Sequence, residues 1–478
     1  MAETAQAATV QASASLEIER RAIDYIPERE RYGSPVSQFT LWFGTNIQIT
    51  ALVDGALAVV FGADAIWAIV GLLVGNIVGG IVMALHSAQG PGLGLPQMIS
   101  SRAQFGVYGA VVPLVLVILM YVGFAATGTV LSGQAINKLL GVSAPSIGIL
   151  IFGALTAVVA IVGYRLIHTV GRISTVVGAV GFVYLLIRLF ATHDVSAAIG
   201  PQAFEMTTFL LAVSLSAGWQ LTFGPYVADY SRYLPSNTDG RKVFATTFLG
   251  SVLGAQVAMT IGVLIAAVAG DAFLPNQVGY LGELAGPAGI AVVIYAVVVV
   301  GKLTANTLNA YGGFMCGLTI SSAFTRSAQV TRRTRVLAIS ALMLFAVAVA
   351  LLASADFLDN FKNFVLLILM VFTPWSAINL ADYYLISKEK FDIPALYDPD
   401  GRYGRWNVTA LVSYAVGIVV QIPFLAQTLY TGPITKALGG ADVSWIVGLV
   451  VTALVYIPWA LRTNRAPAHT IAAEDVPA

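Results

Sequence analysis

Charge and cysteine are scarce in this chain. Charged residues make up only 10% of its 478 positions, and there are one cysteine and four histidines. Because Cys316 is alone, no internal disulfide and no cysteine-based metal site can form. None of the histidines, at His86, His168, His193 and His469, belongs to an HExxH or similar set. These deficits argue against an enzyme, a resident metal and a nucleic-acid partner.

Apolar residues are abundant instead. They make up 58% of the chain, and the mean hydropathy of +0.82 excludes an ordinary soluble domain. A spanning helix needs roughly 20 apolar residues. We therefore predict an all-α membrane protein with twelve transmembrane helices in a lipid bilayer. The helices are expected at about 38–61, 64–86, 107–135, 143–163, 170–190, 205–228, 245–270, 288–319, 335–353, 357–385, 407–429 and 441–461.

The basic residues are distributed unevenly between the links. If the N-terminus lies in the cytoplasm, 20 of the 25 Lys and Arg residues fall in cytoplasmic links. The opposite links hold only Lys138, Lys362 and Lys436, while Arg188 and Lys302 lie inside predicted spans. Because positive charge in short loops marks the cytoplasmic side, both termini are predicted to be cytoplasmic. The Ala- and Gly-rich composition favours a bacterial inner membrane.

Two predicted spans contain residues that interrupt a helix. The first, 38–61, carries Asn46, Gln48 and Asp54 in its middle, and the sixth carries Gly224 and Pro225. Freed backbone groups persist in a bilayer only where they line a cavity or bind something. Breaks five helices apart predict two inverted repeats of five helices, with the discontinuous helices 1 and 6 forming a site near mid-membrane. Two independent kinks are the alternative.

The second predicted span carries Gly71, Gly75 and Gly79 on one face. Small residues at this spacing allow close approach of two helices. The stripe serves either packing inside the chain or a dimer interface, so we expect a monomer or a weak homodimer.

Three motifs resemble the nucleobase–cation symporter family one, in particular its purine–cytosine permease branch. They are WFGTNIQ (42–48), GLGLPQMISSRAQFGVYGA (92–110) and GPYVADYSRYLP (224–235). The resemblance implies an inverted-repeat core of the amino acid–polyamine–cation or sodium-symporter type. It also implies uptake of a nucleobase or related heterocycle by alternating access, with H⁺ or Na⁺ as the coupling ion and no other cofactor.

The expected topology divides the chain into five parts. We predict a cytoplasmic N-terminal tail at 1–36, a ten-helix inverted-repeat transport core at 37–386 and a cytoplasmic loop at 387–406. Helices 11 and 12 follow at 407–461, and 462–478 form a cytoplasmic C-terminal tail. Extramembrane sequence is too short for a catalytic domain, so the function resides within the bilayer.

The resemblance also implies a substrate site. Aromatic side chains of the third and sixth helices would hold a flat heterocycle between them, and amides would read its edge. The positions of this sequence that it indicates are Phe124, Tyr121, Gly128, Trp219, Gln220, Phe223, Asn306 and Asn309, with Asn46 and Gln48 from the first span. The alternatives are plain packing for the two phenylalanines and interhelical bonding for the two asparagines of the eighth helix.

This sequence departs from the family pattern at two of these positions. Phe124 stands where tryptophan is usual, and Gly128 stands where an amide is usual. Such a site suits a larger or less polar heterocycle than cytosine. The alternatives are allantoin, hydantoin or an amino-acid-like solute on the same fold, and a channel or a transport-derived receptor.

Cation coupling is expected between the first and eighth helices. Thr304 falls at one family hydroxyl position, but Leu303 stands where a second hydroxyl is expected, so a Na⁺ site is incomplete. Lys302 would supply a positive charge there, and Asp54 would carry a proton. This favours H⁺ over Na⁺. Alternatively, Lys302 snorkels or forms a structural ion pair, and Asp54 lies partly solvated near the outer mouth.

Overall fold

The structure is a computed structural model that describes residues 23–162, 164–200, 203–325, 331–463 and 465–472. Within these ranges the chain is helical and contains no strand. Two isolated bridges, Asp392 with Ile471 and Ala426 with Thr431, are the only β-type pairings there. The predicted all-α class is confirmed.

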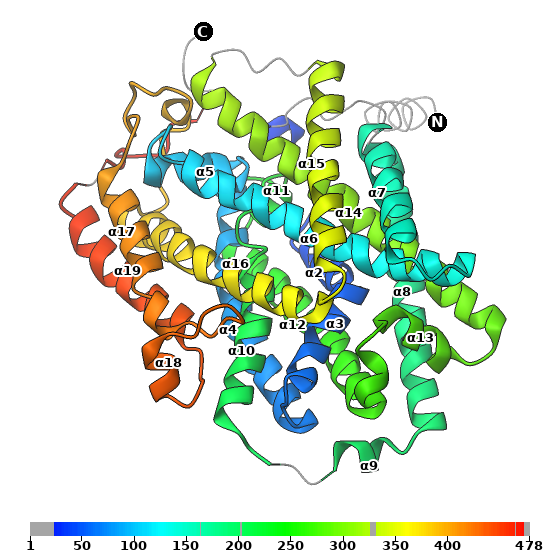
Figure 1. Cartoon of the computed structure of the whole chain (residues 1–478). Coiled ribbons are helices and arrows are strands. Elements are labelled where there is room, and N and C mark those ends of the chain that lie inside the picture. Colours follow the sequence, from blue (N-terminus) through cyan, green and yellow to red (C-terminus); the bar gives the residue numbers. More distant parts are fainter. Residues whose placement is uncertain (1–22, 163, 201–202, 326–330, 464, 473–478) are drawn as a thin grey trace, which may run out of the picture.

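The helices differ widely in length (Figure 1). The long ones are α4 (Ala65–Leu93), α6 (Val111–Leu140), α8 (Tyr164–Thr192), α12 (Gly240–Ala269), α14 (Ala288–Phe324), α15 (Arg332–Ala353) and α16 (Phe357–Leu380). The shorter ones are α2 (Val36–Asn46), α3 (Ile49–Val60), α5 (Gln97–Phe105), α7 (Pro145–Val162), α9 (Val195–Ile199), α10 (Met206–Leu221), α11 (Ala228–Ser231), α13 (Gln277–Ala285), α17 (Val408–Val419), α18 (Pro433–Ala437) and α19 (Ser444–Ala460). Short 3₁₀ helices cover Glu28–Glu30, Gly270–Phe273, Pro394–Leu396 and Ile422–Phe424, and the π-helix η3 (Ala381–Ile386) continues α16.

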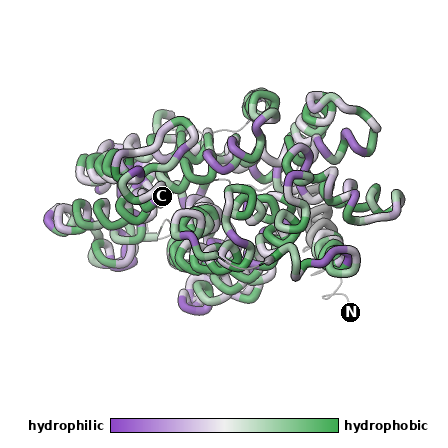
Figure 2. The backbone as a smooth tube through the Cα atoms, turned by 60° about the horizontal axis from the view of Figure 1, so that its bottom comes forward, coloured by the Kyte–Doolittle hydropathy of each residue, from purple (hydrophilic) through white to green (hydrophobic). Residues whose placement is uncertain are grey.

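Six helical segments of the described chain are long and apolar enough to cross a membrane. They are Ala65–Leu93, Val111–Leu140, Gly240–Phe273, Ala288–Phe324, Arg333–Ala353 and Phe357–Ile386. The pair α2 and α3 passes the same test together, as one bent span. Hydrophobic residues cover most helical turns, and hydrophilic residues occur in short stretches between them (Figure 2). These features are those of a multi-pass membrane protein.

Both predicted interruptions are present. Between α2 and α3 the chain leaves the helix at Ile47 and Gln48, and the two helices meet at 60°. The sixth segment ends as a regular helix at Leu221, and the chain runs in turns through Pro225 before α11 begins. The α10 helix stops three residues before Gly224, and the Thr222 hydroxyl donates to the Trp219 carbonyl there (2.7 Å).

The helices form two packed groups. We call α2, α3, α4, α10 and α12 the bundle, because α12 packs on α2, α3 and α4, and α10 packs on α4. We call α6, α7, α14 and α15 the scaffold, because α6 packs on α7 and α14, and α15 packs on α7. Each helix that is interrupted therefore belongs to the bundle.

The glycine stripe of α4 packs inside the bundle. A Cβ atom at Gly71 would meet Ala212 of α10, one at Gly75 would meet Ser216, and one at Gly79 would meet Gln220. These glycines allow the α4 and α10 backbones to approach each other closely. Packing inside the chain accounts for the stripe.

Both ends of the described chain lie beside the 387–406 link. The Tyr397 hydroxyl donates to the Ile23 carbonyl (2.8 Å), and the Ile393 amide donates to the Ile471 carbonyl (3.0 Å). The same end of the molecule holds α5, near the top of Figure 1, whereas α9 lies at the bottom. The two ends of the described chain therefore lie at one end of the molecule.

We expect Gly75→Ala to lower the stability of the protein. The added methyl would overlap the Val213 carbonyl and the Ser216 hydroxyl, and such overpacking costs about 1–3 kcal/mol. Gly317→Ala is the matched control, because nothing lies within 4 Å of a Cβ atom at that position of α14. Thermal unfolding in detergent should show a lower Tm for the first variant only, and equal Tm values would contradict this packing.

Candidate substrate site

A cavity of about 500 Å³ lies between the bundle and the scaffold, which is within the usual range for a small-molecule site. Its walls come from α2, the α2–α3 break, α6, the interrupted sixth segment and α14. It extends from Lys302 to Arg232 and Tyr233, near the end of the molecule that holds the described N-terminal residues. Aromatic side chains dominate the lining: Tyr32, Trp42, Tyr121, Phe124, Trp219, Phe223, Tyr226, Tyr230, Tyr233 and Tyr311.

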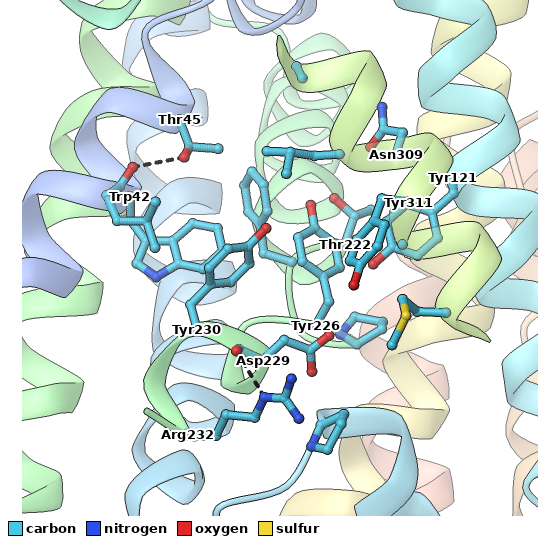
Figure 3. Close-up of a pocket in the computed structure, with 18 of the residues that line it drawn as sticks. Trp42, Thr45, Tyr121, Thr222, Tyr226, Asp229, Tyr230, Arg232, Asn309 and Tyr311 are labelled. Carbon is cyan, nitrogen blue, oxygen red and sulfur yellow. Dashed lines mark hydrogen bonds between the residues drawn. The ribbon is translucent and has the colours of Figure 1, made fainter. Parts of the chain in front are cut away.

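The aromatic rings face the cavity from both groups of helices. Trp42 and Tyr230 lie on one side in Figure 3, and Tyr121 and Tyr311 lie on the other. The Trp42 and Tyr230 ring centroids are 5.4 Å apart and nearly perpendicular. Because the rings present both faces and edges to the cavity, they suit a planar ligand with apolar faces.

Two of the predicted aromatic residues are in contact in the cavity wall. Phe124 of α6 and Trp219 of α10 are 5.8 Å apart, with an interplanar angle of 89°. The Trp219 indole is held in place because its Nε1 donates to Asn46 Oδ1 (2.6 Å). The Asn46 amide in turn donates to the Trp42 carbonyl (2.7 Å) and the Ser251 hydroxyl (3.1 Å). Asn46 therefore lies behind the aromatic wall and positions it.

Asn309 is the amide of α14 that reaches the cavity. It is half-buried, and its side chain makes no hydrogen bond to the residues that the structure describes. In Figure 3 it lies across the cavity from Trp42. An asparagine amide offers both donors and an acceptor. Asn309 is thus placed to recognise the polar edge of a bound ring.

Lys302 lines the cavity beside the α2–α3 break. Its ammonium donates to Gln48 Oε1 (3.0 Å) and to Thr50 Oγ1 (2.7 Å), and the residue is 3% exposed. Gln48 is fixed in turn because its amide donates to the Thr45 carbonyl (2.8 Å). The break therefore holds a buried cation against two neutral oxygen atoms.

The other end of the cavity is connected to α5. Asp229, from the interrupted sixth segment, accepts a hydrogen bond from the backbone N–H of Gln97 (2.7 Å). Gln97 is the first residue of α5. Arg102 of the same helix donates to the Thr319 carbonyl of α14 (2.7 Å). Burial lowers the pKa of Arg102 to about 10, which leaves the side chain charged at neutral pH. The helix α5 is therefore held by both the bundle and the scaffold.

Six predicted residues lie outside the cavity lining: Asn46, Asp54, Gly128, Gln220, Thr304 and Asn306. Gln220 is hydrogen-bonded within the bundle. Its Nε2 donates to Asn76 Oδ1 (2.9 Å), and its Oε1 accepts from the Ser251 hydroxyl (2.6 Å). Asn306 donates to the Ala125 carbonyl (2.8 Å) and the Thr129 hydroxyl (3.2 Å) of α6. Both amides connect neighbouring helices, as the alternative for Asn306 expects.

The predicted coupling residues Asp54 and Thr304 are also apart from the cavity. Both carboxylate oxygens of Asp54 are buried and have no hydrogen-bond partner among the residues that the structure describes. Asp54 follows Thr50 by one helical turn, so both lie on one face of α3, while Gly55 faces α12. The Thr304 hydroxyl lies 3.5 Å from the Val300 carbonyl of its own helix. The described residues contain no cluster suited to a metal ion.

Several lining residues were not predicted. Trp42, Thr222, Tyr226, Tyr230 and Tyr311 all face the cavity. A signal for two of them is visible in the motif at 224–235, where Tyr226 and Tyr230 are four residues apart, the spacing of residues on one face of a helix.

Comparison with known proteins agrees with this architecture. Residues 25–448 match the family described as "Permease for cytosine/purines, uracil, thiamine, allantoin". The chain is 37% identical over 441 residues to the "Putative purine-cytosine permease YxlA" of Bacillus subtilis, a match that covers 92% of this chain and 95% of that protein. It is 26% identical to a purine-cytosine permease of Emericella nidulans, and the match covers 93% of this chain and 89% of that protein.

Among solved structures, the inward-facing conformation of Mhp1 has the same fold, with a TM-score of 0.73 and 20% identity over 95% of this chain and 96% of Mhp1. A closed conformation of Mhp1, a nucleobase-cation-symport-1 family transporter with bromovinylhydantoin bound, gives the same TM-score. That match covers 94% of this chain and 96% of Mhp1. The family model covers most of the chain, and the Bacillus subtilis relative matches it over almost its full length. The chain therefore belongs to the family of membrane permeases for cytosine/purines, uracil, thiamine and allantoin.

Proposed function

We propose that this protein imports a nucleobase of the purine or cytosine type by symport with H⁺. The observation that carries the proposal is the aromatic cavity between two interrupted helices, with the unpartnered amide of Asn309 in its wall. Stacking on rings gives affinity for any flat heterocycle, whereas an amide discriminates by its donor and acceptor pattern. Relatives named purine-cytosine permeases support the substrate class.

Within this site we assign stacking to Phe124, Trp219 and Phe223, with Tyr121 closing the opposite wall. Phe223 lies 5.2 Å from Trp42, and Tyr121 lies 5.4 Å from Tyr226, so each belongs to a ring cluster that spans the cavity. Asn309 would bind the ring edge. Asn46 and Gln48 would act indirectly, by holding Trp219 and Lys302.

The proposed topology has twelve spans, built as two inverted repeats of five helices at 37–386 followed by two further helices at 407–461. It is supported by six long apolar helices, the bent pair α2–α3, and shorter apolar helices at Pro145–Ile161, Val176–Thr192, Met206–Leu221, Val408–Phe424 and Ser444–Ala460. The basic links favour cytoplasmic termini in an inner membrane. The tails 1–36 and 462–478 and the loop 387–406 would then share the cytoplasmic side.

Transport would proceed by alternating access, with the bundle moving against the scaffold around the cavity. With this orientation the cavity reaches the cytoplasmic end through Arg232 and Tyr233. We propose a monomeric working unit, because the glycine stripe of α4 is used within the chain. A substrate drives the exchange only if it binds one state better than the other.

We propose H⁺ as the coupling ion. The Thr304 hydroxyl faces its own helix and Leu303 offers none, so the hydroxyl pair expected of a Na⁺ site is not assembled. Asp54 lies one turn further than Thr50 towards the proposed outer side. It would relay a proton from that side to the α2–α3 break.

The proposed function is tested by uptake of radiolabelled cytosine, hypoxanthine, uracil and allantoin in cells that lack other permeases. We expect accumulation of hypoxanthine or cytosine above the external concentration, collapsing when a protonophore is added. Competition by unlabelled bases ranks the substrates. Uptake that only equilibrates would identify a channel, and accumulation of allantoin alone would identify the allantoin alternative.

Asn309→Ala should raise the KM for the transported base about tenfold, because a lost hydrogen bond to a buried ligand costs about 1–1.5 kcal/mol. Asn363→Ala is the matched control, since Asn363 bonds to Thr428 at an exposed site away from the cavity. Initial uptake rates over a range of substrate concentrations measure both. Full affinity in the Asn309 variant would remove this residue from the site.

Asp54→Asn should abolish pH-dependent accumulation while leaving exchange of internal for external substrate intact. The amide has the same shape, so the buried position is filled, but it cannot carry a proton. Accumulation is compared at external pH 5.5 and pH 8 for the variant and the unaltered protein. An unchanged pH dependence would take Asp54 out of the coupling mechanism.

A further inference from the structure

Lys302 is a buried charged residue inside a predicted span, and it is bonded to neutral groups. Its two hydrogen-bond partners are Gln48 Oε1 and Thr50 Oγ1, on either side of the point where α2 ends and α3 begins. Among the described residues it forms no ion pair with an acidic side chain. A buried charge in a span is costly and generally marks function.

The lysine side chain occupies space that Gly128 leaves open. A Cβ atom at Gly128 of α6 would overlap Lys302 Cε and Asn306 Oδ1 on α14. Gly128 stands where the family resemblance expects an amide side chain. An amide side chain is larger than glycine, and at this position it would exclude the lysine. The missing side chain on α6 and the added cation on α14 are therefore complementary features of one site.

The groups that bind the ammonium are those that a small metal cation would need. Na⁺, like other hard cations, prefers carbonyl and hydroxyl oxygens, and Gln48 and Thr50 present one of each. A second cation at the same oxygens would lie within about 4 Å of the ammonium. Two like charges at that distance repel strongly in a site shielded from water. The ammonium and a free cation therefore exclude each other.

We propose that the ammonium of Lys302 is the coupling cation of this transporter, attached covalently to α14 in place of a free Na⁺. This deepens the proposed function and rests on it. A lysine amine exists with or without its proton, so the charge at the break enters and leaves as H⁺. On release, Lys302 Nζ passes one H⁺ to water in the cavity and becomes a neutral amine. One H⁺ arriving from the side of Asp54 restores the ammonium.

Other titratable groups lie near enough to be considered. Those lining the same cavity are Tyr32, Tyr121, Tyr226, Asp229, Tyr230, Arg232, Tyr233, Tyr311 and Cys316. Those on α14 itself or on described parts of the helices packed against it are Arg102, Lys138, Tyr184, Arg188, Tyr280, Glu283, Tyr295, Arg333 and Arg335, and α3 adds Asp54. Several bond elsewhere: Lys138 pairs with Glu283, and Arg188 and Arg335 donate to backbone carbonyls. None of them is bonded to Lys302.

The first test needs no substrate. Purified full-length protein in detergent is incubated with ²²Na⁺, and bound radioactivity is measured over a range of Na⁺ concentrations. We expect no saturable binding, because Lys302 holds the oxygens at the break. Saturable Na⁺ binding to the unaltered protein would overturn the proposal, whichever solute the protein carries.

The second test separates coupling from binding. Proteoliposomes containing the protein are assayed with radiolabelled hypoxanthine and cytosine, both for exchange and for accumulation driven by an inward proton gradient. We expect Lys302→Met to accumulate at least tenfold less substrate and to keep measurable exchange, so that the loss of accumulation exceeds any loss of exchange. Lys138→Met, at an exposed ion pair with Glu283, should change neither.

Lys302→Arg decides between a fixed charge and a proton carrier. Arginine keeps the positive charge but does not release its proton at physiological pH. We therefore expect the arginine variant to exchange substrate without accumulating it. Full accumulation by the arginine or methionine variant would overturn the proposal, as would loss of exchange in a monodisperse methionine variant. If the unaltered protein exchanges neither base, the proposed function fails, and the Na⁺ binding result still decides the role of Lys302.

Discussion

The architecture depends on how polar groups are satisfied where a helix is interrupted inside an apolar environment. At the α2–α3 break, Lys302 donates to side chains on both sides of the bend. At the end of α10, the Thr222 hydroxyl donates a hydrogen bond to the Trp219 carbonyl. Without such partners each of these buried polar groups would cost several kcal/mol in hydrocarbon. The cavity exists because these two interruptions face each other and are stabilised locally.

The rest of the molecule keeps the two interruptions in place through close backbone packing. Glycines of α4 allow α10 to approach, and Gly262 of α12 approaches the Leu52 carbonyl of α3. Contacts of this kind leave little freedom within the bundle, because protein interiors are packed to high density. The aromatic cavity lies between the bundle and the scaffold, outside these close backbone contacts.

Much of the fold could be predicted from the sequence, but only part of the site. Hydrophobic length located the six long apolar helices, and Pro225 and the polar residues of 38–61 located the interruptions. Residue type alone could not show that Gln220 and Asn306 bond to neighbouring helices, because that depends on what lies opposite each helix face. Trp42 was missed for a related reason, since its direction depends on how α2 packs against α12.

The short helix α5 sets a geometric condition on any movement of the two groups. Its first amide is bonded to Asp229 of the interrupted sixth segment, while Arg102 in its last turn is bonded to Thr319 and Ser322 of α14. A rotation of the bundle must either carry α5 along, and so pull on the Arg102 contacts, or release the Gln97 amide from Asp229. The link between α4 and α6 therefore works as a strut, and its length limits how far the interrupted sixth segment and α14 can separate at this end of the molecule.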